Sequence, residues 1–322
     1  MSRVLVAGGR GFMGRRIVRL LKQTLPDVEV LTAGRGAAND RPLDVKEPDA
    51  AALEGVNVLI NAVGPFDYDP TRLVNASHGA GAHYVDIAET EDFIAKAARA
   101  HDSLAAVSGA SSVPGLVQVL AQTCAAEPPK RIRAQLSIGT KNPASTTLLY
   151  SMLQQVGRDG CFRSSWLRAH DGIAARRYGS YPGLTASLRV GGRDVPAEFG
   201  FGFDRRSYTR LLLIFAPMIG LLPRPLLRFE AWWAALVSPL LGPFGTKVGI
   251  LSLDALDESG AVTGSVEVRA RENGLDVPAW PAVWATEALL KSTQPARRLS
   301  DLLTPNATAE KLRAAGYEVS GT

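Results

Sequence analysis

Cysteine and histidine are scarce in this chain of 322 residues, which contains two cysteines and four histidines. Cys124 and Cys161 form no Cys-x-x-Cys pair, and no histidines stand in a His-Glu-x-x-His arrangement. The sequence therefore excludes a disulfide scaffold and these common zinc sites, and we expect no metal. Two reduced thiols in a chain of this size are typical of a cytoplasmic protein.

Concentrated runs of charge are also missing. The formal net charge is +5, but the basic residues are spread along the chain without a tract and without interleaved aromatic residues. We therefore expect no nucleic-acid partner. A positive field would suit an anionic cofactor or an anionic membrane surface equally well. We expect no signal peptide, because the first apolar run leads directly into glycines.

The N-terminal third of the chain shows short apolar runs that alternate with segments of helical periodicity. Apolar runs rich in β-branched residues are typical of buried parallel strands, whereas apolar spacings of three and four indicate a helix. Alternation of the two predicts an α/β fold with a doubly wound parallel sheet. We expect strands at 3–7, 28–32, 56–61, 83–86 and 104–107, with helices near 13–21, 70–79 and 91–101.

A glycine-rich turn joins the first expected strand to the first expected helix. Its Gly-x-Gly-x-x-Gly pattern allows a tight turn, close approach of a pyrophosphate and close packing of the helix on the strand. The free N–H groups and the dipole at the helix N-terminus favour a phosphate there. In this context the turn predicts a Rossmann dinucleotide-binding domain. The residues expected to bind the cofactor here are Gly8, Gly9, Arg10, Gly11, Phe12, Met13 and Gly14.

The end of the second expected strand predicts which dinucleotide is bound. Sites that prefer NAD usually carry Asp or Glu there, which binds the ribose 2′-hydroxyl. This chain has Ala33-Gly34-Arg35 instead, with no carboxylate in that position. Because an arginine can pair with a 2′-phosphate, we favour NADP(H) over NAD(H), with Arg35 as the phosphate ligand and Arg10 as a second one. Asp44 is expected to border the adenine pocket.

Another candidate loop follows the third expected strand. Ligands in such sheets lie at the carboxyl ends of the strands. Gly64 and Pro65 would stiffen a loop that runs beside the cofactor, together with Ala62 and Val63. A simple strand-ending turn explains the same residues equally well, so both interpretations stay open.

Several motifs recur at defined places relative to these elements. They are the glycine turn at 6–14, Ala33-Gly34-Arg35, Asn61-Ala62-Val63-Gly64-Pro65-Phe66, Gly81-Ala82-His83-Tyr84-Val85-Asp86, Ser111-Ser112-Val113-Pro114-Gly115-Leu116, and a tail at 298–303 and 317–319. Together they resemble the saccharopine dehydrogenase-like reductases. The resemblance covers residues 1–120 and the tail, whereas the middle of the chain does not match.

This resemblance implies a domain order and a reaction class. The family has a Rossmann domain with a substrate domain inserted before the last helix, and performs NAD(P)-linked reduction of imines or of C=C bonds in lipid-like substrates. It also implies a homodimer built on the middle sheet. We expect a dinucleotide-binding domain at 1–120, an α+β substrate or dimerisation domain at 121–275, and a tail at 276–322 that returns to the Rossmann domain.

No motif identifies a proton donor. Short-chain dehydrogenases use Tyr-x-x-x-Lys, but none of the seven tyrosines has a lysine four residues later. That family is therefore not favoured. Tyr84, Asp86 and Lys141 are the catalytic candidates, because they fall near the ends of predicted strands.

The middle segment has a different pattern from the N-terminal third. Residues 131–138 alternate polar and apolar side chains, which predicts a half-buried antiparallel strand, and a helix is expected near 145–157. The runs 248–253 and 265–270 flank a turn and predict a hairpin. Aromatic and aliphatic residues at helical spacing predict a further helix over 278–291.

Two long apolar runs, 211–222 and 231–244, leave three interpretations open. They could form a buried core or dimer interface, or an apolar lid or pocket for a lipophilic substrate. They could also form an interfacial membrane anchor, in which Trp232 and Trp233 lie at headgroup level. Each run contains proline and is short for a bilayer span.

The sequence as a whole favours an NADPH-dependent oxidoreductase. Such an enzyme would transfer a hydride to the C=N or C=C bond of a small substrate, either lipophilic or a biosynthetic intermediate. The alternative hypothesis is a non-catalytic NADP(H)-binding protein that associates with a membrane or lipid surface. The exposed or buried state of residues 211–244 bears directly on this alternative.

Overall fold

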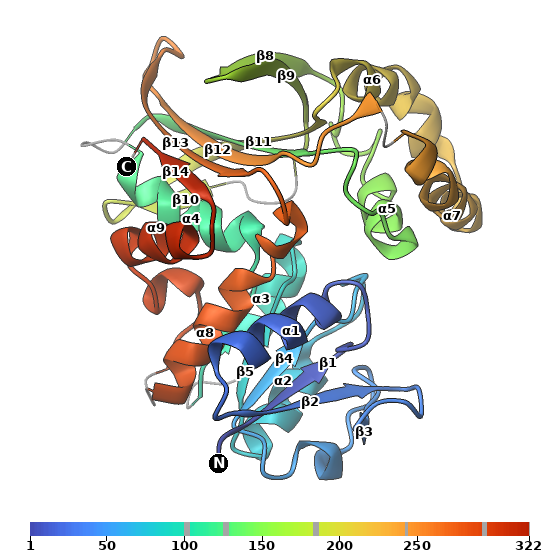
Figure 1. Cartoon of the computed structure of the whole chain (residues 1–322), viewed down its shortest axis with the longest axis vertical. Coiled ribbons are helices and arrows are strands. Elements are labelled where there is room, and N and C mark those ends of the chain that lie inside the picture. The colour runs from blue at the N-terminus through green and yellow to red at the C-terminus, as the bar shows by residue number, and fades with distance from the viewer. Residues whose placement is uncertain (100–103, 125–128, 183–186, 242–243, 292–294, 322) are drawn as a thin grey trace. The chain divides into compact units, whose positions relative to one another are not determined.

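A computed structural model gives the fold of the chain (Figure 1). It describes residues 1–99, 104–124, 129–182, 187–241, 244–291 and 295–321. The chain divides into two compact units, which are treated separately below. Unit 1 comprises residues 1–119 and 276–304, and unit 2 comprises residues 120–275 and 305–322.

Unit 1 is built on a parallel sheet of six strands in the order β3-β2-β1-β4-β5-β6. The strand order reverses between β1 and β4, as in a Rossmann domain, so the predicted doubly wound fold is confirmed. The strands are β1 (Arg3–Ala7), β2 (Glu29–Gly34), β3 (Arg41–Pro42), β4 (Val58–Asn61), β5 (His83–Asp86) and β6 (Ala106–Val107).

Helices cover both faces of this sheet. The helices α1 (Gly14–Thr24) and α8 (Trp280–Lys291) pack against each other and against β1, β4 and β5. The helix α2 (Thr71–Gly79) packs with the short helix η1 (Ala50–Leu53) on the other side, next to α3 (Glu91–Arg99). The predicted helix 91–101 extends to residues 100 and 101, which lie outside the described residues. Shorter helical segments are η2 (Ser112–Leu116), α4 (Val117–Leu120) and η6 (Leu299–Asp301).

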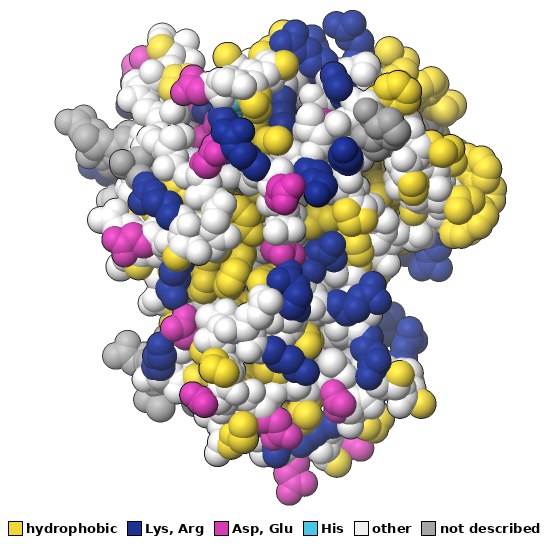
Figure 2. Space-filling view, in the orientation of Figure 1, with side chains coloured by type: hydrophobic (Ala, Val, Ile, Leu, Met, Phe, Trp, Pro, Cys, Tyr) yellow, Lys and Arg dark blue, Asp and Glu magenta, His cyan; other side chains and the backbone are white. Residues whose placement is uncertain are grey.

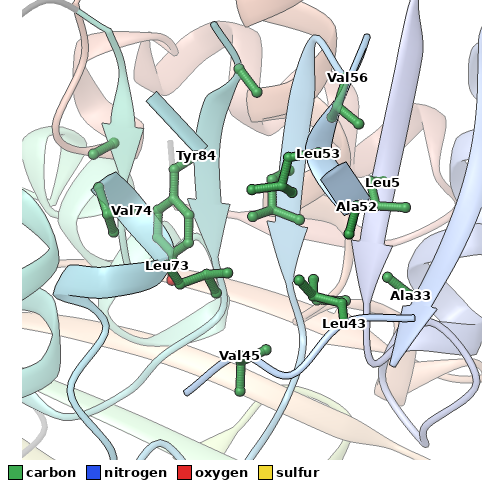
Figure 3. Packing of buried hydrophobic residues seen from close by; sticks show 14 of the residues in the cluster. Leu5, Ala33, Leu43, Val45, Ala52, Leu53, Val56, Leu73, Val74 and Tyr84 are labelled. Atoms are coloured by element: carbon green, nitrogen blue, oxygen red, sulfur yellow. The ribbon is translucent and has the colours of Figure 1, made fainter. Parts of the chain in front are cut away.

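The core under α2 and η1 shows why these residues form a sheet. In Figure 3 alternate residues of the strands point to one side and meet the apolar faces of α2 and η1. Leu5, Leu59 and Tyr84 are completely buried there. Successive strand residues point to opposite faces, and the central strands β1, β4 and β5 are buried on both faces, so their apolar side chains contribute to the core on each side of the sheet. Tyr84 therefore belongs to the core of unit 1.

Unit 2 is built on a mixed sheet with the strand order β14-β13-β12-β7-β11-β9-β8, and β10 pairs with β11. Its strand pairs are antiparallel, apart from β7 and β11, which are parallel. The strands are β7 (Arg131–Ile138), β8 (Ser165–His170), β9 (Ile173–Ser180), β10 (Ser187–Val190), β11 (Arg193–Phe203), β12 (Gly249–Leu256), β13 (Val262–Ala270) and β14 (Glu318–Ser320).

The helices of unit 2 complete the element order. They are η3 (Ala121–Thr123), α5 (Thr146–Leu153), α6 (Arg206–Leu221), α7 (Arg224–Leu241), η5 (Gly274–Asp276), whose last residue lies in unit 1, and α9 (Pro305–Ala314). The predicted strand 131–138, the helix after it and the hairpin of β12 and β13 are present. The strands β8 to β11 were not predicted, although residues 199–203 of β11 alternate phenylalanine and glycine with a period of two.

Buried charges connect strands that lie far apart in this sheet. Arg168 on β8 donates to Asp254 on β12 at 2.8 Å and to Glu267 on β13 at 2.7 Å. His170 contacts Glu267 at 2.7 Å through Nδ1 and Tyr178 Oη at 2.9 Å through Nε2. Since β8 forms one edge of the strand order and β13 lies next to the other edge, the sheet must curl to allow these contacts.

The tail differs from the sequence-based domain boundaries. Residues 276–304 group with unit 1, but residues 305–322 group with unit 2. The reason is that β14 pairs with β13, with Val319 opposite Val268. The expected return of the whole tail from 276 to 322 to the Rossmann domain is therefore wrong for its last part.

Candidate functional site

The glycine turn lies at the carboxyl end of β1, where the strand order reverses in the parallel sheet of unit 1, called sheet A below. Gly8 has a φ of +73°, a left-handed conformation that favours glycine. The Gly11 N–H donates to the carbonyl oxygen of Gly8 at 2.8 Å and closes the turn. A Cβ atom on Gly14 would overlap that same carbonyl oxygen. Gly14 therefore allows α1 to pack directly against the end of β1, as the pattern predicted.

The first turn of α1 leaves backbone donors unused. Met13 is the N-cap residue, and its side chain makes no capping hydrogen bond. Among the described residues, no acceptor takes the N–H of Phe12, Met13 or Gly14, whereas Arg15 N–H donates to Gly11 O at 3.0 Å. Unpaired N–H groups and the positive end of the helix dipole create an anion-binding position.

The loop after β4 lies directly beside this turn. Ala62 N–H donates to Ala7 O at 2.9 Å, which continues the pairing of β4 with β1. A Cβ atom on Gly8 would lie 3.0 Å from both Ala62 O and Val63 Cγ2. The structure thus brings the predicted loop and the glycine turn together at the same edge. Gly64 is exposed and Pro65 is half-buried.

A hydrogen-bond network holds this loop in place. Asn61, the last residue of β4, donates through Nδ2 to Tyr68 Oη at 2.8 Å and to Tyr84 Oη at 2.9 Å. Its Oδ1 accepts from the N–H of Val63 at 3.2 Å. The ring of Tyr68 packs edge-on against Phe93 of α3, with 5.3 Å between ring centroids. Tyr68 was not among the predicted site residues, because a single tyrosine in a loop carries no periodic signal.

Tyr84 and Asp86 have structural surroundings that do not suit a catalytic role. Both side chains are completely buried. Asp86 accepts hydrogen bonds from Ser108 Oγ at 2.6 Å and from the N–H groups of Gly109 and Ala88 at 2.9 Å. Burial raises the pKa values of both Tyr84 and Asp86. With no exposed atom, neither side chain can meet a substrate in this conformation. Asp86 holds the loops after β5 and β6, whereas Tyr84 belongs to the Asn61 network after β4.

The end of β2 presents the predicted arginine to solvent. Arg35 is exposed, and among the described residues it has no hydrogen bond or ion pair. Arg10, inside the glycine turn, is exposed as well. Asp44 is half-buried after β3, and its Oδ1 accepts from the N–H of Lys46 at 3.0 Å. These three residues stay candidates for the adenosine end of a dinucleotide.

One carboxylate in this region was missed. Asp40 accepts from both the N–H of Thr32 at 2.7 Å and its hydroxyl at 2.8 Å. These hydrogen bonds lower the pKa of Asp40, and Arg10 adds a smaller effect in the same direction. Positions 33–35 themselves carry no carboxylate, but Asp40 was missed as a neighbour of Thr32. The loop between β2 and β3 folds back, so Asp40 lies beside a residue eight positions earlier.

Lys141 belongs to unit 2, on the loop after β7. Its side chain is exposed, and its backbone N–H donates to Thr246 O at 3.0 Å. Its role as a proton donor stays a prediction. Within the described parts of both units, no group of three or more His, Cys, Asp or Glu side chains is arranged to hold a metal ion.

No family model matches the chain, and no curated protein matches it. A putative exported protein from Burkholderia pseudomallei is 26% identical over 27% of this chain, with a TM-score of 0.23, and the match covers 47% of that structure, about half its length.

Two dehydrogenase structures match over most of their length. An engineered D-amino acid dehydrogenase bound to NADP+ is 15% identical, with 91% of this chain and 90% of that one covered and a TM-score of 0.43. The DAP dehydrogenase of C. glutamicum in complex with DAP is 14% identical, with the same two coverages of 91% and 90% and a TM-score of 0.44.

Proposed function

We propose that the chain is an oxidoreductase that binds NADP(H) at the carboxyl edge of sheet A. The observation that carries this proposal is the unpaired N-terminus of α1 at the point where the strand order reverses. In doubly wound sheets a dinucleotide lies in the crevice at this reversal, with its pyrophosphate on the helix N-terminus. The N–H groups of Phe12, Met13 and Gly14 are the available donors.

Each part of the site suits one part of the cofactor. Gly11 is exposed at the turn, so a pyrophosphate can approach the backbone there. Arg35 is free to pair with a 2′-phosphate. The loop from 62 to 65, held by Asn61, would border the nicotinamide half. When bound, the cofactor supplies the hydride, and the protein supplies orientation and electrostatics.

The finer assignment is the reduction of a C=N or C=C bond, as in the saccharopine dehydrogenase-like reductases. It is supported by the place of their motifs in unit 1: the turn at 8–14, Arg35 and the loop at 61–66 all follow carboxyl ends of strands in sheet A. Because Tyr84 and Asp86 are buried, Lys141 is the remaining candidate for the proton donor.

The phosphate role of the turn can be tested with Gly11→Ala. The added Cβ would lie 3.0 Å from Gly8 O, a tight contact, at a turn residue that is itself exposed. Because a methyl group there would keep a pyrophosphate from close approach to the backbone N–H groups, we expect the affinity for NADPH, measured by quenching of protein fluorescence, to fall by at least about tenfold, as much as one charge-assisted hydrogen bond contributes.

The matched control is Gly79→Ala at the end of α2, where a Cβ meets nothing within 4 Å. It should bind NADPH as the wild type does. Equal affinity of wild type and Gly11→Ala, with both variants folded by circular dichroism, would contradict the proposed site.

The non-catalytic alternative keeps support from one observation, the exposed apolar side chains on α6 and α7. It predicts NADPH binding without substrate-dependent oxidation of the cofactor. Absorbance at the NADPH band in the presence of imine and enone substrates separates the two functions. A cytoplasmic location and a homodimer also stay proposals.

A further inference from the structure

An extensive apolar surface lies on α6 and α7 of unit 2. Figure 2 shows hydrophobic side chains gathered over these two helices. The exposed apolar residues of these helices are between 46% and 85% exposed. We call this set the hairpin surface: Leu211, Ile214, Phe215, Met218 and Leu221 on α6, and Leu226, Phe229, Trp232, Trp233, Leu236 and Leu240 on α7. An exposed patch of this kind marks an interaction site in a folded protein.

The hairpin surface is not the core-facing side of the helices. Leu227 and Ala231 of α7 are completely buried and pack with Tyr150 of α5. On α6, Ala216 is buried, and its backbone lies against Gly157. At 3.6 residues per turn, these buried positions stand opposite the exposed apolar ones. Both helices therefore carry two apolar faces, one packed and one open, so of the three interpretations burial in the core of the chain applies only to the packed face.

The charges around the hairpin surface are almost all positive. Residues 205–244 contain five arginines and one acidic residue, Glu230. Among the described residues, none of these arginines forms an ion pair; Arg206, for example, donates to the carbonyl oxygen of Ala175 at 2.6 Å. Arg224 and Arg228 are exposed and stand on α7 between its packed face and its open face. Both guanidinium groups thus border the apolar stripe on one side, and that of Arg228 also lies over the ring of Tyr150, 5.3 Å from its centroid.

This combination fits the interface of a bilayer. Aromatic side chains such as Trp232 and Trp233, each 50% exposed, are favoured at the level of lipid headgroups. Arginines on the flanks can reach the phosphates of anionic lipids while the apolar stripe enters the acyl boundary. In the described parts of the chain, no helix has the length and apolar content to cross a membrane. The helices would therefore lie along the surface.

We propose that α6 and α7 dock unit 2 on an anionic lipid bilayer. The charge favours lipid over a second copy of the chain as the occupant. Two copies that joined through this surface would bring two arginine-rich rims together, whereas anionic headgroups complement them. The proposal is independent of the NADP(H) site, because every residue that carries it belongs to unit 2.

Flotation of the full chain with vesicles tests the docking. Vesicles of phosphatidylcholine alone are compared with vesicles of phosphatidylcholine and phosphatidylglycerol in equal parts. We expect the wild type to float with the anionic vesicles and to be released as salt is raised. The double variant Trp232→Ser/Trp233→Ser should lose flotation. The double variant Arg224→Gln/Arg228→Gln should partition about 25-fold more weakly onto anionic vesicles, at about fivefold per arginine.

The matched control is Leu167→Ser/Val262→Ser, which removes side chains that are 50% and 58% exposed on the strands β8 and β13. It should float like the wild type. NADPH binding, measured on the same samples, should be unchanged in all variants and reports separately on the cofactor proposal.

Two outcomes would overturn the proposal. One is a wild type that stays at the bottom of the gradient with anionic vesicles. The other is a lipid-free dimer in sedimentation equilibrium that the tryptophan double variant dissociates, which would assign the surface to a second copy. If the tryptophan variant does not fold, the arginine variant still decides the question.

Discussion

At the end of β2, two side chains of opposite charge bear on the choice between NADPH and NADH. Arg35 is exposed and has no partner among the described residues, whereas Asp40 is held by two hydrogen bonds to Thr32. A carboxylate in this region favours a ribose hydroxyl, and a free guanidinium favours a 2′-phosphate. Because Thr32 already holds Asp40 through two hydrogen bonds, we expect Arg35 to dominate.

The variant Arg35→Ala tests this balance. We expect its affinity for NADPH to fall roughly 10- to 100-fold, the loss of hydrogen bonds to a charged group, and its affinity for NADH to change less than about twofold. Isothermal titration with both cofactors measures the ratio. Arg72→Ala, an exposed arginine on α2, is the control. Equal loss for both cofactors would remove the 2′-phosphate role.

Among the elements, the curled sheet of unit 2 depends on its buried charges. Burial opposes the ionisation of Glu267, but hydrogen bonds from His170, Arg269 and Arg168 outweigh it and lower the pKa of Glu267 to about 2. The side chains of Arg168 and Glu267 are 15% and 10% exposed. This cluster fixes β8 over β12 and β13, which local strand pairing alone would not do.

The lowered pKa of Glu267 predicts an acid-sensitive stability. The carboxylate stabilises the folded state above its ordinary pKa of 4.5, and this contribution is lost as the pH falls toward 2. At pH 7 we expect Glu267→Gln to lower the free energy of unfolding by about 3 kcal/mol, since it removes the carboxylate that Arg168, His170 and Arg269 share in this buried cluster. Urea unfolding at a series of pH values should show the two proteins converging below pH 4.5.

Glu272→Gln provides the control for this prediction, because its carboxylate is 71% exposed and its pair with Lys247 is 3.5 Å long. Exposed pairs contribute little to stability. A constant difference between wild type and Glu267→Gln from neutral pH to pH 2 would show that the charge of Glu267 is not the cause.

At the scale of the whole molecule, the two units carry separate features. Unit 1 holds the unpaired helix N-terminus, Arg35 and the loop after β4, and unit 2 holds the curled sheet and the hairpin surface. Each unit has its own sheet and its own buried side chains. Cofactor binding and lipid docking can therefore be measured independently of each other.

This separation predicts where NADPH protects the chain from hydrogen exchange. At about 100 times its dissociation constant, a ligand stabilises the state that binds it by about 2.7 kcal/mol. We expect slower exchange in peptides that contain residues 8–16, because the N–H groups of Phe12, Met13 and Gly14 gain acceptors. The Gly11→Ala variant should show little protection at the same concentration. Unchanged exchange at residues 8–16 in wild type with NADPH bound would place the cofactor elsewhere.

The sequence by itself determined the Rossmann unit and the glycine turn. Their information is local: a strand, a turn and a helix follow one another, and Gly8, Gly11 and Gly14 each stand where the backbone requires no side chain. Only the tertiary structure decided that Asp40 lies beside Thr32 and that Tyr84 and Asp86 are buried. These facts depend on loops that fold back and on contacts between distant strands.

The apolar runs at 211–222 and 231–244 show most clearly what the sequence alone does not determine. Helices that are apolar on all sides are usually buried, so composition kept a buried core or dimer interface among the three interpretations. The structure packs Leu227 and Ala231 inward and leaves Trp232 and Trp233 half exposed. Periodicity cannot distinguish a face that meets the protein from a face that meets another phase, because both are apolar. Only the packing of neighbouring elements decides which face stays open.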